Sequence, residues 1–165
     1  MKILRNFLLS LAKNQVFSQL FLFNPDSKHQ ENMEKVLKSD NIETRMLLAE
    51  ALSRNIEEIS RKMVFFKEND KDVFFEYMNV LFYQLADPEA EIGLKVLKLL
   101  INIADFSMKN KEPVFFLDKS LMKYLENGLF KGKDVVKVRF MDLIASISTK
   151  SPEFFEINRG FFYKL

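Results

Sequence analysis

Residues 133–155 read KDVVKVRFMDLIASISTKSPEFF, a basic turn followed by an apolar helical stretch and a Ser-Pro step. The Asp at its start recurs along the chain, because 47 residues separate Asp40 from Asp87 and again Asp87 from Asp134. A period in the forties that is carried by helices is typical of HEAT and armadillo repeats. The sequence therefore predicts an all-α fold, a HEAT/armadillo-like α-solenoid of about three helical pairs plus the start of a fourth.

The same spacing relates apolar positions in the second and third pairs. These positions are Phe74 and Leu121, Phe75 and Met122, Met78 and Leu125, Phe82 and Leu129, Leu94 and Met141, Leu97 and Ile144, and Leu100 and Ile147. We expect all of them to face the core, as they recur at helical spacing. The first pair fits with a slip of one residue. Other side chains expected on the inner stripes are Ile42, Leu48, Ala51, Leu52, Ile56, Leu81, Leu85, Ile101, Ala104 and Val138.

Polar and glycine residues predict the helix ends. The recurring Asp40, Asp87 and Asp134 are expected to be N-caps, since a carboxylate can accept a hydrogen bond from a free backbone N–H there. Gly128 and Gly132 are expected to end the helix that starts near residue 119, because glycine favours the C-terminal turn.

One domain of stacked repeats accounts for the whole chain. The expected repeats span residues 1–60, 61–110, 111–150 and, in part, 151–165. The incomplete last repeat indicates a piece of a longer array or half of a dimer that buries the open end, since solenoids normally end in a polar capping helix. Segment 1–23 is interrupted by polar residues and is predicted to be a first repeat helix, with a mitochondrial presequence as the alternative.

Paired phenylalanines stand near the expected junctions between repeats. They are Phe65-Phe66, Phe115-Phe116 and Phe154-Phe155. We interpret them as aromatic plugs that fill the irregular space of the connections, with ligand binding as the alternative.

The residues that carry most enzyme chemistry are scarce. The chain has no Cys and one His, His29, so a thiolate site, a catalytic triad or a two-His metal site cannot be built from it. The segment 128–133 lacks the spacing of a phosphate-binding loop. The net charge of +2 gives no long-range field for nucleic acid or acidic lipid. We therefore predict a chain without enzyme activity, cofactor or metal that binds neither nucleic acid nor membranes.

A protein partner is the remaining expectation, because repeat proteins bind over extended surfaces. Polar residues off the core stripe of the second helices are the candidates for this surface. They are Glu50, Arg54, Lys95, Lys98, Asn102, Arg139 and Asp142. The uncapped C-terminal end is a candidate for self-association.

The order of residues across 134–153 resembles the 26S proteasome non-ATPase regulatory subunit 5 family. The shared features are the acidic start, the Arg, the Leu-Ile, the Ile-Ser and the Ser-Pro-Glu: Asp134, Arg139, Leu143-Ile144, Ile147-Ser148 and Ser151-Pro152-Glu153. The resemblance implies an α-solenoid chaperone that binds an ATPase subunit of the regulatory-particle base during assembly. Members of that family are several times longer than this chain.

Two other functions remain open at this stage. An unrelated HEAT/armadillo adaptor in transport or trafficking would share the fold. A small all-α enzyme or lipid binder would instead use the Phe-rich core as a closed pocket. The absence of Cys fits a reducing compartment, so the cytoplasm is the expected location, with the nucleus as a further one.

Overall fold

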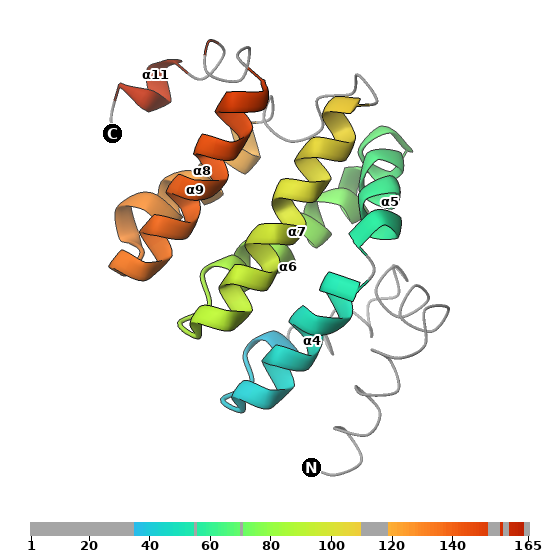
Figure 1. Cartoon of the computed structure of the whole chain (residues 1–165), viewed down its shortest axis with the longest axis vertical. Coiled ribbons are helices and arrows are strands. Elements are labelled where there is room, and N and C mark those ends of the chain that lie inside the picture. The colour runs from blue at the N-terminus through green and yellow to red at the C-terminus, as the bar shows by residue number, and fades with distance from the viewer. Residues whose placement is uncertain are drawn as a thin grey trace.

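The structure of this chain is a computed structural model. It describes residues 35–54, 56–69, 71–109, 119–151, 156 and 159–163. Within these ranges every regular element is a helix and none is a strand (Figure 1). The predicted all-α class is therefore confirmed for the described part of the chain.

Seven helices follow one another along these ranges. They are α4 (Ile42–Arg54), α5 (Ile56–Asn69), α6 (Lys71–Leu85), α7 (Ala90–Lys109), α8 (Lys119–Lys131), α9 (Asp134–Lys150) and the short α11 (Arg159–Phe162). The predicted start of α8 near residue 119 is confirmed.

Helix α7 is the centre of the arrangement. It packs against α4, α5, α6 and α9, and α8 packs against α9. Figure 1 shows α4, α7 and α9 side by side, with α6 and α8 behind them. The helices therefore form two layers, and the core lies between them.

The core is built from aliphatic and aromatic side chains of every long described helix. Phe74, Met78, Leu81 and Leu85 of α6 are buried, as predicted for the inner stripe of that helix. Phe82 stacks on Tyr124 of α8 with ring centroids 5.3 Å apart. It also stacks on Phe140 of α9 at 6.1 Å. These aromatic contacts join the two layers where α6, α8 and α9 meet.

Burial repeats at the predicted spacing of 47 residues. Met78 and Leu125 are both buried, and the same holds for three further pairs: Phe82 and Leu129, Leu97 and Ile144, and Leu100 and Ile147. The slip of one residue in α4 is also present. Its buried side chains Leu48, Ala49, Ala51 and Leu52 precede the buried Val96, Leu97, Leu99 and Leu100 of α7 by 48 residues.

The prediction of buried inner stripes was wrong for residues at the margins of these stripes. Leu94 is 49% exposed and Met141 is 58% exposed, and Ile42 and Val138 are also exposed. Leu94 lies about 60° around its helix from the buried Leu97, and Met141 lies equally far from Ile144. Both side chains therefore stand at the edge of the buried arc, where apolar composition alone does not determine the side that faces solvent.

A separate helix, α5, occupies residues that the sequence analysis assigned to an inner stripe and a connection. Ile56 does not extend the stripe of α4 but begins α5. Phe65 and Phe66 are part of the α5 helix instead of a linker, so this plug was wrong. Glu57 and Glu58 occupy the first turn of α5, where carboxylates stabilise the free N–H groups.

None of the three recurring aspartates is an N-cap residue, so this prediction was wrong, and only Asp87 makes a side-chain hydrogen bond next to a helix start. The Asp87 carboxylate accepts a hydrogen bond from the Glu89 N–H at 2.9 Å, before α7. At the start of α4 the acceptor is Asn41, whose side-chain oxygen lies 3.3 Å from the Thr44 nitrogen. At the start of α9 the N-cap is Lys133 without a side-chain hydrogen bond, and Asp134 is already helical.

Gly128 has a packing role and does not end its helix. It lies within α8, which continues to Lys131. The helix therefore ends next to Gly132, as predicted for that second glycine. A Cβ atom at Gly128 would stand 2.5 Å from ring carbons of the buried Phe140. The chain therefore needs a glycine here because the aromatic ring of α9 packs directly on the α8 backbone.

Several sequence predictions lie outside the described residues. These are the first helix, the Phe115-Phe116 and Phe154-Phe155 pairs, His29 and the side chain of Leu121.

Truncation of the paired core residues Leu97 and Ile144 tests the repeat register. We expect Leu97→Ala and Ile144→Ala each to lower the free energy of unfolding by about 2–5 kcal/mol, because each leaves a cavity. The matched changes Leu94→Ala and Met141→Ala should cost less than about 1 kcal/mol. Urea unfolding followed by circular dichroism measures all four, and equal losses in the two sets would contradict the register.

Candidate functional site

Two features of the structure are candidates for function. The first is the outer face, which we define as the exposed side chains of α4, α7 and α9. The second is the Asp87 corner, which we define as residues 84–89, the last two residues of α6 and the connection to α7. The outer face can meet a partner, whereas the corner holds the helices that carry this face in place.

Six of the seven predicted partner-binding residues lie on the outer face at least in part. Arg54, Lys98, Asn102 and Asp142 are exposed, and Glu50 and Lys95 are partly exposed. Ion pairs link Arg54 to Glu50 at 3.4 Å and Lys95 to Glu91 at 3.6 Å. Such exposed pairs within one helix contribute little to stability, so a partner could replace them at low cost.

Equivalent positions on α7 and α9 differ in charge. Lys98 is exposed and has no ion-pair partner in the described part of the chain, and 47 residues later Ala145 is exposed. The Asn102 side chain donates to the Lys98 carbonyl at 2.8 Å. Asp142, also exposed, has no ion pair among the described residues.

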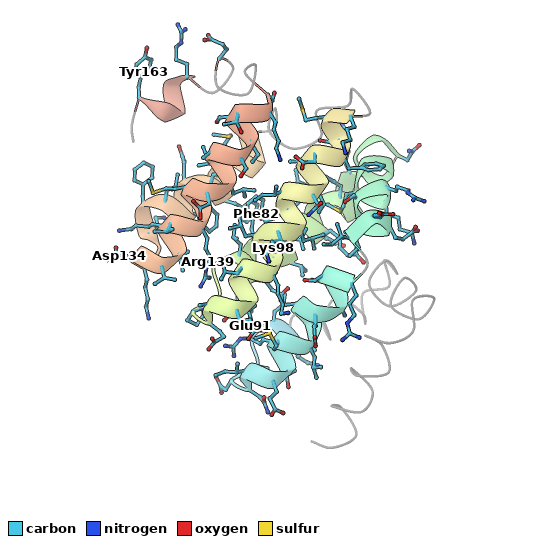
Figure 2. The ribbon with its side chains drawn as sticks, in the orientation of Figure 1. Phe82, Glu91, Lys98, Asp134, Arg139 and Tyr163 are labelled. Carbon is cyan, nitrogen blue, oxygen red and sulfur yellow. The ribbon has the colours of Figure 1, made fainter. Side chains whose placement is uncertain are left out.

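The prediction that Arg139 belongs to a partner surface was wrong. This side chain is 2% exposed, and Figure 2 shows it between α9 and α7. Its Nη1 atom donates to the carbonyls of Leu85 at 3.0 Å and Asp87 at 2.7 Å. Burial lowers the pKa of Arg139, and the negative charges of Asp87 and Glu89 act in the opposite direction.

A second arginine reaches the same corner from α4. Arg45 Nε lies 2.7 Å from one oxygen of the buried Asp87 carboxylate, and Nη2 lies 3.3 Å from the other. The hydrogen bond to Asp87 raises the pKa of Arg45, although burial opposes the rise. Arg45 also donates to the Ser39 carbonyl, and the buried Gln84 amide donates to the Arg45 carbonyl at 3.4 Å.

The corner therefore joins three neighbouring helices of one layer. Arg45 comes from α4, the corner precedes α7, and Arg139 comes from α9. Gly93 leaves room for this arrangement, because a Cβ atom there would overlap the Arg139 guanidinium. An ion pair between Lys150 and Asp105 adds a contact between α9 and α7 near their other ends.

The structural roles of the buried Arg139 and the partly buried Arg45 were not predicted, although the sequence holds a signal for them. Arg45 follows Asp40 by five residues, and Arg139 follows Asp134 by the same distance. Such a recurring charged pair beside a buried stripe indicates a structural contact as readily as a surface. The exposed apolar side chains of α9, among them Val135, were also missed as surface residues.

The described residues contain no group of three or more His, Cys, Asp or Glu side chains that could hold a metal ion. Among these same residues, no helix is both long and apolar enough to cross a membrane.

Comparison of the chain with protein-family models, with curated proteins and with solved structures found no match in any of the three.

Proposed function

We propose that this chain is a non-catalytic protein-binding module of the HEAT/armadillo type, and that its partner lies along the outer face. The observation that carries the proposal is the repeated exposure of apolar side chains. Leu94 and Met141, 47 residues apart, are both about half exposed on neighbouring helices. Repeat proteins bind partners along extended surfaces that equivalent positions of successive repeats build.

The packing of the helices supports a solenoid. In such a fold each repeat contacts its neighbours through one layer of equivalent helices. Here α7 lies between α4 and α9, and the buried positions of α7 and α9 are related by 47 residues. The Asp87 corner adds polar contacts from both neighbouring helices.

We also propose that the partner is an ATPase subunit of the proteasomal regulatory particle. The support is the resemblance of residues 134–153 to the non-ATPase subunit 5 family. Most of the resembling side chains with described burial, such as Arg139, Leu143 and Ile147, are buried. These residues therefore support helix packing like that of the subunit 5 family. The identity of the partner has to be tested on the outer face.

Affinity capture from a eukaryotic lysate tests the proposal when the bait is compared with a face variant. We expect the unmodified chain to enrich a proteasomal ATPase subunit, as identified by mass spectrometry. The Leu94→Asp/Met141→Asp variant should lose this protein, because two charges would replace apolar contacts. The control Asn79→Asp/Tyr83→Asp places the same charges on exposed positions of α6 and should retain it.

The outcomes separate the parts of the proposal. The unmodified chain could instead capture a different protein that the face variant loses. This outcome would support the binding module and reject the proteasomal partner. This result would favour an unrelated adaptor. Equal capture by the face variant and the α6 control, with both folded by circular dichroism, would reject the outer face as the binding surface.

A further inference from the structure

The corner between α8 and α9 exposes large apolar side chains. Residues 130–138 read FKGKDVVKV. Phe130 is 50% exposed, Val135 is 57% exposed and Val138 is 55% exposed. Three large apolar side chains are thus about half exposed within nine residues of the chain, and exposed apolar groups that gather on a surface can mark an interaction site.

Lysines surround these apolar side chains. Lys131 and Lys133 are exposed and have no ion-pair partner in the described part of the chain. Lys137 lies 3.4 Å from Asp134, but that carboxylate is 99% exposed, so the pair is weak and exchanges readily with other partners. We define the basic corner as six residues: Phe130, Lys131, Lys133, Val135, Lys137 and Val138.

The corner before α7 does not share these residues. The positions 47 residues earlier carry Gln84, Ala86, Pro88, Ala90 and Glu91 in place of Lys131, Lys133, Val135, Lys137 and Val138. Only the exposed aromatic position is common to both, as Tyr83 is exposed like Phe130. One corner thus lacks lysine and holds a buried carboxylate, whereas the other is basic and apolar.

We propose that the basic corner binds a segment of a partner protein in which acidic side chains stand beside apolar ones. This inference rests on the proposed function and adds the chemistry of the partner. Phe130, Val135 and Val138 provide area for apolar contact, and the three lysines provide charge that is complementary to carboxylates. The patch continues along α9 to the exposed Met141, which joins it to the outer face.

A protein segment fits this surface better than an anionic membrane does. Asp142 is exposed one residue beyond Met141, and Glu91 is exposed on the neighbouring helix α7. A flat anionic surface that reached the basic corner would approach these carboxylates as well and would be repelled by them. A narrow segment can contact the lysines without covering Asp142 or Glu91.

Fluorescence anisotropy with a pair of synthetic peptides tests the inference on the full chain. The first probe is an amphipathic peptide with a leucine and phenylalanine stripe next to a run of glutamates, and the second has lysines in place of the glutamates. We expect the acidic probe to bind at least about tenfold more tightly than the basic one, and the difference to shrink at high salt. Equal affinities, or no detectable binding of either, would overturn the inference.

Charge-reversal variants locate the binding. Lys131→Glu/Lys133→Glu should raise the Kd of the acidic probe by about tenfold or more. The control Lys109→Glu/Lys123→Glu changes the net charge equally at exposed lysines of α7 and α8 and should have little effect. Equal losses in the two variants would show a general charge effect and would contradict the basic corner. Binding to phosphatidylserine vesicles but not to the acidic probe would identify a membrane surface and overturn the inference.

The lysate capture separates this inference from the proposed function. If the Leu94→Asp/Met141→Asp variant loses the partner and Lys131→Glu/Lys133→Glu retains it fully, the outer face is supported and the basic corner is rejected. If neither variant loses the partner, both proposals are rejected.

Discussion

Asp87→Ala is expected to lower the free energy of unfolding by about 3–5 kcal/mol, the range for loss of one partner from a buried ion pair. Its carboxylate is bound at both oxygens by Arg45, whose side chain is 12% exposed and would lose its counter-charge in a largely desolvated place. The same carboxylate accepts a hydrogen bond from the Glu89 N–H just before α7, and loss of such a bond costs about 1 kcal/mol. Urea unfolding followed by circular dichroism measures the change.

The repeat itself supplies the control for Asp87. Asp134, 47 residues later, is fully exposed and does not cap α9, so Asp134→Ala should change stability by less than about 0.5 kcal/mol. Similar losses for the two variants would contradict the special position of Asp87. A small loss for both would show that the Arg45 contact contributes little.

Arg139→Ala is expected to cost about 3–4 kcal/mol, because it leaves the buried carbonyls of Leu85 and Asp87 without their donor and opens a cavity. Arg54→Ala is the control on the outer face and should cost less than about 0.5 kcal/mol. Thermal and urea unfolding of both variants give the comparison.

A double-mutant cycle tests how Arg139 is held in place. Gly93→Ala should destabilise the unmodified chain by about 1–3 kcal/mol, because the new methyl group overlaps the guanidinium. In the Arg139→Ala background the same change should be neutral or stabilising, since alanine is a better helix former than glycine. Additive losses in the cycle would contradict direct contact between these residues.

Much of the fold could be predicted because the apolar pattern of α6 and α7 recurs in α8 and α9. The repeat places Met78 and Leu125 in the core, and it also gives Leu94 and Met141 the same exposed environment. The period thus correctly predicts that two positions are equivalent. It cannot predict which side of a helix they face, because α7 packs against four other helices and its buried arc has edges that composition does not mark.

The candidate site was harder to predict because charge was taken to indicate exposure. That assumption holds for Lys98 and Asp142 but fails for Arg139, whose guanidinium finds two backbone carbonyls at a helix corner. These acceptors come from residues more than fifty positions earlier, so no local pattern reveals them. The exposed Val138 was missed for the opposite reason, since an apolar residue was taken to be buried.

Site-specific photo-crosslinking tests most directly whether a partner lies on the outer face. Benzoylphenylalanine would replace Lys98 or Met141 on this face, or Asn79 on the exposed side of α6, and each chain would be irradiated in lysate. We expect the same partner to be crosslinked from positions 98 and 141 and not from position 79. Crosslinking from position 79 alone would place the partner on the other layer and contradict the account.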